Sequence, residues 1–257
     1  RLVNFGFSGT AEEAALDDDK QDNTLFVSTN DGMLHAIEPK TGKELFAFMP
    51  HEELKRTDER YLSATRDPKA PAQIDGTDPQ RATYGLDGGI TVWRRTKADG
   101  SGQPEHVFLY LSQRRGGNAY SALNVSDRDD PRLMWKIEGG AAPFEKLGQT
   151  WSQPTLAQIV LGGQRVPVLI FGGGYSPTDH DTIGAVSGGD SIGNAIYMVN
   201  AFSGKLIWSV SNAGATESHG DMKWASAKAA CALALSTTDT AGALARAEAL
   251  HCPRMAG

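Results

Sequence analysis

The sequence contains very little cysteine. Its two thiols, Cys231 and Cys252, both lie near the carboxyl terminus, and residues 1–230 have none. A scaffold held together by disulfides is therefore excluded for most of the chain. The redox compartment stays open, because a protein with a large hydrophobic core does not need disulfides to be secreted.

Long apolar runs and basic blocks are also missing. No apolar stretch approaches the ~20 residues that a membrane-spanning helix needs, so no membrane span is expected. The formal net charge is −6, and no block of Lys and Arg stands out, which argues against a nucleic-acid partner. The sequence begins at Arg1 without a signal-peptide pattern, and we expect it to be a piece of a longer protein.

Patterns that carry catalysis are absent as well. No two of the six histidines have the spacing of a metal-binding HExxH motif, and His35 lies inside an expected strand, where a structural role is favoured. The glycines at 172–174 follow a strand but lack GxGxxG or a Lys-Ser/Thr pair, so phosphate binding is not expected. The sequence predicts no catalytic residue and no cofactor-binding residue.

What the sequence does contain is a repeated strand pattern, clearest in the stretch TLFVSTNDGMLHAIEPKTGKELFAF at 24–48. Short apolar runs alternate there with tight-turn signals such as Asn30-Asp31-Gly32 and Thr41-Gly42, which predicts a three-stranded antiparallel meander. Two further copies run over 119–137 and 195–210. The copies share a central-strand residue that we expect to be buried: Ile37, Leu123 and Val199. They also share a large aromatic residue in the last strand, expected to pack between repeats: Phe46, Trp135 and Trp208.

The strand candidates group into units of four. They lie at 90–94, 106–111, 119–125 and 132–137, and again at 152–160, 166–171, 195–200 and 205–210. Four antiparallel strands per unit are typical of a β-propeller blade. The first unit shows only three, and its fourth strand would come from residues 1–10 or from elsewhere in a longer chain. We therefore predict an all-β fold, a partial β-propeller of about three four-stranded antiparallel blades with loop insertions. Because propellers close with ~4–8 blades, three form an open arc.

Three regions follow from this pattern. Residues 1–23 are interpreted as a polar linker, although the acidic run at 17–22 could alternatively hold Ca²⁺. Residues 24–224 form the partial propeller, with a surface insertion and one short helix at 51–82. Residues 225–257 are rich in alanine and are interpreted as a weak helix or a disordered tail.

Several stretches resemble the PilC/PilY family of type IV pilus biogenesis proteins, whose C-terminal half is a quinoprotein-like β-propeller. The more specific ones are RRGGNAYSALNVSD at 114–127 and GQTWSQPT at 148–155, and the resemblance covers about residues 24–224. It implies a protein that supports pilus extension against retraction and attaches to surfaces. It also implies export through the periplasm to the pilus or outer membrane at the bacterial cell surface. The implied partners are pilins, minor pilins and a host-surface ligand.

The chain departs from the family at two points. Family propellers often carry Asp-rich calcium loops, but the corresponding stretch at 97–102 keeps one Asp, which cannot supply the 6–8 oxygens that Ca²⁺ prefers. We therefore carry over no calcium ligand and predict no cofactor. After HGDMKW at 219–224 the family pattern stops, as a frameshift or a truncated gene would cause.

Two loops offer alternatives. Asp179, Asp181 and Asp190 are weak candidates for a metal site in the Gly-rich loop at 172–193, although a hydrated loop is favoured. The stretch Gln113-Arg114-Arg115-Gly116-Gly117 could cradle an anion, but a blade turn whose arginines pair with acidic neighbours is favoured. A non-enzymatic binding protein is thus the main hypothesis, with contacts at 51–82, 95–105 and 172–193. The alternatives are a quinoprotein dehydrogenase using a quinone and Ca²⁺, and a generic propeller scaffold.

Overall fold

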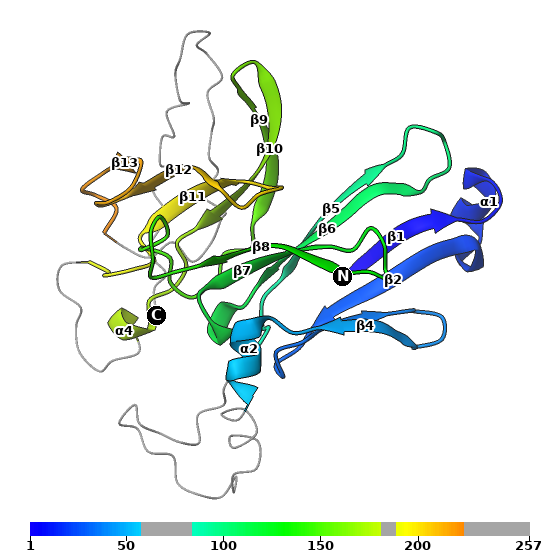
Figure 1. Ribbon diagram of the computed structural model, residues 1–257, viewed down its shortest axis with the longest axis horizontal. Helices are drawn as coiled ribbons and strands as arrows, with labels where there is room; N and C mark the ends of the chain where they lie inside the picture. Colours follow the sequence, from blue (N-terminus) through cyan, green and yellow to red (C-terminus); the bar gives the residue numbers. More distant parts are fainter. Residues whose placement is uncertain (58–83, 181–188, 224–257) are drawn as a thin grey trace, which may run out of the picture.

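The computed structural model describes residues 1–57, 84–180 and 189–223. Within them the chain forms three antiparallel sheets in succession, here called blades 1, 2 and 3 (Figure 1). Blade 1 consists of β1 (Leu2–Phe7), β2 (Gln21–Ser28), β3 (Leu34–Ile37) and β4 (Glu44–Phe48). Blade 2 consists of β5 (Ile90–Thr96), β6 (Pro104–Ser112), β7 (Ala119–Asn124) and β8 (Arg132–Glu138). Blade 3 consists of β9 (Thr155–Leu161), β10 (Gln164–Gly172), β11 (Ala195–Asn200) and β12 (Leu206–Ser211), with β13 (Glu217–Ser218) pairing parallel to β12.

Short helices lie between the strands. They are α1 (Ala11–Leu16), α2 (His51–Lys55) and α4 (Pro177–His180), with 3₁₀ turns η1 (Asp18–Lys20) and η2 (Arg114–Gly116). Thr10 and Glu13 form a reciprocal capping box at the start of α1, which satisfies two otherwise unpaired main-chain donors. None of the helices in the described ranges is long and apolar enough to cross a membrane.

In each blade every strand pairs with its sequence neighbour, so the predicted partial propeller of four-stranded blades is confirmed. The predicted equivalence of Ile37, Leu123 and Val199 is confirmed by the strand pairing, but the expected burial holds only for Leu123 and Val199, because Ile37 is partly exposed. In all three blades the register of the last pair of strands shifts immediately before that residue. The turns of blades 1 and 3 match too, because Gly42 and Gly204 have φ of +72° and +68° and donate to equivalent carbonyls four residues earlier. A positive φ strains any residue with a Cβ, which explains glycine at both positions.

The amino terminus differs from the interpretation of 1–23 as a polar linker. Residues 2–7 form β1, which pairs with β2 and completes blade 1. The fourth strand of the first unit therefore comes from residues 1–10, which was one of the two sources expected from the sequence. The physical reason is that Val3 and Phe5 point to one side of β1 and are 5% and 4% exposed in the same apolar cluster as Phe26. Burial of two large apolar side chains outweighs the polar character of the flanking residues.

One strand boundary also differs from the expectation. The strand expected at 152–160 begins only at Thr155, because the polar groups before it bind other strands. The helix expected in the 51–82 insertion is α2, and residues 58–83 lie outside the described residues. The alanine-rich stretch at 225–257 also lies outside them.

Apolar clusters fill the two interfaces between blades. Blade 1 packs on blade 2 through a cluster that includes Phe26, Ala36, Leu109 and Leu123. Blade 2 packs on blade 3 through a larger one, rich in aromatic rings: Phe108, Tyr110, Tyr120, Trp135, Phe144, Phe171 and Tyr197. Burial in this second interface raises the pKa of the Tyr110, Tyr120 and Tyr197 hydroxyls well above the ordinary value.

Candidate binding surface

The joint between blades 2 and 3 is centred on Trp135, near the middle of β8. Its indole Nε1 donates to the main-chain carbonyl of Ala201 at 3.0 Å, and the hydroxyl of Tyr110 donates to the same carbonyl at 3.2 Å. The indole ring lies on Gly204, where a Cβ would be 2.8 Å from Cδ2 of Trp135. The joint therefore requires an indole on one blade, and a carbonyl and a glycine in a turn of the next.

The two more specific sequence motifs meet at the same joint. Thr150 Oγ1 accepts from the main-chain N of Gln113 at 2.8 Å and donates to the carbonyl of Ala119 at 3.2 Å. Ser152 Oγ accepts from the main-chain N of Gly172 at 2.9 Å, and its carbonyl accepts from the buried hydroxyl of Tyr120. The segment between β8 and β9 thus links the β6–β7 turn to the end of β10, so these motif residues hold blades together.

A buried polar contact holds α2 to the same turn. The side chain of Glu53 is fully buried, and its Oε1 accepts from Nε2 of Gln113 at 2.7 Å. The other end of the Gln113 amide accepts from the main-chain N of Ala119 at 3.0 Å. Gly116 follows in the turn, and a Cβ there would lie 1.7 Å from the carbonyl oxygen of Gly85. The glycine therefore allows two segments of main chain to approach each other.

The arginines of this turn form a cluster with aromatic rings. The guanidinium of Arg114 lies 4.5 Å from the ring centroid of Trp151, and that of Arg115 lies 4.7 Å from the ring of Tyr84. Arg115 also donates to the Tyr84 hydroxyl at 2.7 Å and lies 3.8 Å from the carboxylate of Asp87. Among the described residues Arg115 follows the expectation of pairing with an acidic neighbour, whereas Arg114 stacks on an indole. A guanidinium stacked on a ring still points its N–H donors outward in its own plane, so the Arg114 side of this cluster suits recognition of a polar or anionic partner.

The two described candidates for a metal site, Asp179 and Asp190, interact with different side chains. Asp179, in α4, accepts from the hydroxyls of Ser176 and Ser191 at 2.5 and 2.8 Å, and the bond from Ser176 is the main reason why the pKa of Asp179 is lowered. Asp190 lies 3.0 Å from Nε2 of His180. Asp181 lies outside the described residues. Among the residues that are described, no three His, Cys, Asp or Glu side chains come together as a metal site would require.

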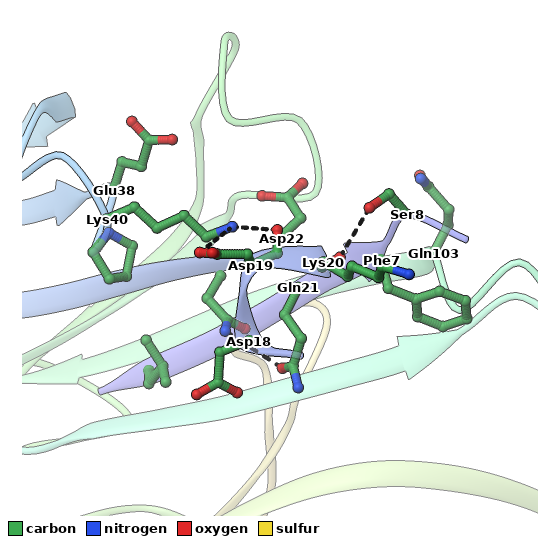
Figure 2. Close-up of a pocket in the computed structure, with 13 residues that line it drawn as sticks. Phe7, Ser8, Asp18, Asp19, Lys20, Gln21, Asp22, Glu38, Lys40 and Gln103 are labelled. Atoms are coloured by element: carbon green, nitrogen blue, oxygen red, sulfur yellow. Dashed lines mark hydrogen bonds and ion pairs between the residues drawn. The ribbon is translucent and has the colours of Figure 1, made fainter. Parts of the chain in front are cut away.

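A hollow of about 670 Å³ opens beside blade 1 (Figure 2). Its walls come from β1, from η1 with the start of β2, and from the β3–β4 turn, where Glu38, Pro39 and Lys40 lie. The acidic run considered for Ca²⁺ lies here, and its carboxylates have protein partners: Lys40 is 3.7 Å from Asp19, and Arg128 of blade 2 binds Asp22 at 2.6 Å. Charged and amide side chains thus make up much of the lining of the hollow.

Three consecutive antiparallel blades, packed through apolar clusters and, between blades 2 and 3, through an indole on a carbonyl and a glycine, define a β-propeller-type protein. The family described as the PilY1 beta-propeller domain matches residues 5–231, and the chain belongs to this family. The resemblance to PilC/PilY proteins seen in the sequence is therefore confirmed.

Named relatives agree with this assignment. The type IV pilus biogenesis factor PilY1 of Pseudomonas aeruginosa strain UCBPP-PA14 is 29% identical over 163 residues, covering 63% of this chain and 12% of that protein. A PilY1 homolog of Xylella fastidiosa strain Temecula1 is 30% identical over 166 residues, covering 61% of this chain and 11% of that protein. The chain thus spans about one eighth of the length of these curated relatives. The crystal structure of the P. aeruginosa PilY1 C-terminal domain is 22% identical with a TM-score of 0.48, covering 77% of this chain and 33% of that one.

Proposed function

We propose that this chain is the binding scaffold of a type IV pilus biogenesis and adhesion factor, acting at the bacterial cell surface without catalysis. In this role it supports pilus extension against retraction and contributes to surface attachment. The observation that carries the proposal is the use of the motif residues. Thr150 and Ser152 bind the β6–β7 turn and the end of β10, and Gln113, directly before the other motif, binds Glu53 of α2, so these residues hold the scaffold together and the other loops of the blades are left for recognition.

The Arg114–Trp151 cluster is the part of this scaffold that best fits a pilin or minor-pilin partner. Arg115 keeps 45% of its side chain exposed, and it lies beside two aromatic rings that supply contact area at low entropic cost. Arginine and aromatic residues dominate the binding energy of protein interfaces. A partner with a carboxylate-rich surface would accept from the guanidinium of Arg114 and from the Arg115 nitrogen that binds neither Tyr84 nor Asp87.

The proposal is tested in a bacterium that makes pili, by replacing Arg114 and Arg115 with Gln in the full-length factor carrying this chain. Surface pili are counted by electron microscopy in a retraction-competent strain and in one without the retraction motor. We expect fewer pili in the first strain and normal numbers in the second, since opposing retraction is needed only when retraction occurs. Arg165→Gln, on the β9–β10 hairpin, is the matched control. Normal piliation in the first strain would contradict the assigned surface, and equal loss in both would contradict the opposition to retraction.

Absence of catalysis is tested separately. The purified chain is incubated with pyrroloquinoline quinone, Ca²⁺ and primary alcohols in a dye-linked assay, and we expect no turnover. Turnover that disappears in Asp179→Asn or Asp190→Asn, but persists in Asp99→Asn, would overturn the binding-only proposal in favour of a quinoprotein dehydrogenase.

A further inference from the structure

Blades 2 and 3 are also connected by a cluster of aromatic rings near the start of β6. The His106 imidazole stacks on Phe108, with ring centroids 4.5 Å apart and an angle of 13° between the ring planes. Trp93 of β5 meets the His106 ring edge-on at 4.6 Å. Phe202, in the β11–β12 turn of blade 3, lies 4.8 Å from Trp93 and 6.1 Å from His106. The cluster therefore ties a turn of blade 3 to the sheet of blade 2.

The equivalent position of blade 1 makes the equivalent contact with other chemistry. Strand register places His106 of blade 2 where blade 1 has Asp22. Asp22 accepts two hydrogen bonds from the guanidinium of Arg128, at 2.7 and 2.6 Å. Arg128 lies in the β7–β8 turn of blade 2, which corresponds to the turn that carries Phe202 in blade 3. Blades 1 and 2 thus each present one side chain to the same turn of the next blade, and in blade 2 that side chain titrates near neutral pH.

One nitrogen of the His106 ring lies inside the aromatic cluster. Nε2 is buried and has no hydrogen-bond partner among the described residues. A neutral imidazole tolerates this position, because its proton can stay on Nδ1. The imidazolium carries a proton on both nitrogens, so its Nε2–H would be a buried donor without an acceptor. The cluster therefore fits the neutral ring better than the charged one.

The charges around His106 do not reverse this preference. Burial lowers the pKa of the imidazole below its ordinary value near 6.5, and this effect is larger than that of Glu105, which raises the pKa, while Arg95 lowers it further. Glu105 and Arg95 also pair with each other at 3.0 Å. Lys205, the one charged residue of the β11–β12 turn, is exposed, and residues 124–126 of the neighbouring β7 side are uncharged. The neutral, closed cluster is thus most stable above the ordinary pKa and weakens as the pH falls toward the folded pKa.

We propose that His106 is a pH-sensitive latch between blades 2 and 3. When the ring gains a proton, it leaves the aromatic cluster to hydrate its Nε2–H, and Phe202 separates from blade 2. Phe202 is already 47% exposed, so little cover has to move. The neighbouring carbonyl of Ala201 keeps its two donors, so the joint loosens at one end without coming apart. The latch lies near the start of β6, whereas the Arg114–Trp151 cluster follows the end of β6, so the two sites are separate.

The first test follows amide hydrogen exchange by mass spectrometry in the full-length factor carrying this chain. The main-chain N–H groups of Phe202 and Ser203 donate to the Asn200 side chain at 2.9 and 3.0 Å, so their exchange reports on the turn. After correction for the intrinsic rates, we expect exchange there to be several-fold faster at about pH 5 than at about pH 7.5. His106→Phe keeps a ring but cannot titrate, so it should remove the difference between the two pH values. The matched control is His219→Phe, at a histidine whose side chain is 60% exposed, and it should keep the difference. Equal exchange at both pH values, or a difference that persists in His106→Phe, would overturn the proposal.

The second test uses the reciprocity of linked equilibria and leaves His106 in place. If protonation releases Phe202, then removal of the Phe202 ring must make protonation easier by the same free energy. The pKa of His106 is measured in the full-length factor through deuterium exchange at the imidazole C2 position. We expect a pKa below 6.5 in the unchanged factor and a higher one in Phe202→Ala. Ser203→Ala, at the next and equally exposed position of the turn, should leave the pKa unchanged. A pKa that Phe202→Ala does not raise would show that His106 and the turn are not coupled, and the latch would be refuted.

Discussion

The main-chain carbonyl of Ala201 accepts two hydrogen bonds, so we expect substitutions of its two donors to have non-additive effects on the free energy of unfolding. Tyr110 and Trp135 both donate to it, at 3.2 and 3.0 Å, and Ala201 is fully buried. Tyr110→Phe removes one donor but leaves the carbonyl partnered, so it should lower the free energy of unfolding by only ~0.5–1.5 kcal/mol. Trp135→Phe also leaves the carbonyl partnered, yet it removes part of a buried ring, so a cost of about 1–2 kcal/mol is expected.

The double variant removes both donors and leaves a buried carbonyl unpaired. The extra cost of such a group is ~1–3 kcal/mol, so the double variant should be less stable than the sum of the single effects by at least about 1 kcal/mol. The stacking of the Tyr110 and Trp135 rings, whose centroids are 5.8 Å apart, is largely kept because phenylalanine retains an aromatic ring.

The assay is a double-mutant cycle: urea unfolding of the unchanged chain, the two single variants and the double variant, followed by fluorescence and circular dichroism. A control cycle pairs Tyr110→Phe with Trp208→Phe, which share no acceptor, and should be additive within ~0.5 kcal/mol. If the first cycle is also additive within that limit, then water or another donor reaches the Ala201 carbonyl, and the reasoning about the joint is refuted.

Three further predictions concern the β6–β7 turn and α4. Gln113→Ala removes a buried amide that binds at both ends, so urea unfolding should show a loss of ~1–3 kcal/mol. Gly116→Ala places a Cβ against the carbonyl of Gly85, which cannot move cheaply, so the soluble yield and melting temperature should fall sharply. The hydrogen bond from Ser176 lowers the pKa of Asp179, so its contribution to stability is full above the unfolded pKa near 4 and is lost as pH falls through the folded pKa. Asp179→Asn should therefore lower the urea midpoint slightly at pH 7 and by less as the pH falls through the folded pKa, and the effect is small because solvent screens this partly exposed group.

The strands were predictable because their signals are local. In the meanders of 119–137 and 195–210, alternating apolar residues and Gly-containing turns lie within 20 residues of each other, and the observed strands match closely. β1 was only one of two sources offered for the fourth strand, because only Val3 and Phe5 mark it and Gly6 breaks the pattern soon after. Two buried side chains are a weak signal in a sequence, although they are enough to complete a sheet.

The binding surface was predictable only in part. The recurrence of tryptophan at blade ends indicated packing between blades, which Trp135 confirms. Its acceptor could not be predicted, because it is a main-chain atom 66 positions away and any residue type supplies one. The stacking of Arg114 on Trp151 was missed for a similar reason, since the turn and the β8–β9 connection meet only after both blades have formed.

The pairing of every strand with its sequence neighbour has a consequence for the order of folding. All contacts within a blade join residues close in the chain, so a blade closes few long loops and is expected to form quickly. The joints between blades depend on more distant pairs such as Tyr110 and Ala201, and they form only when two blades are complete. We therefore expect folding to proceed in units of one blade, from whichever blade forms first. The slow and aggregation-prone intermediates are those in which one blade has formed but its neighbour has not, so that one apolar face is exposed to solvent.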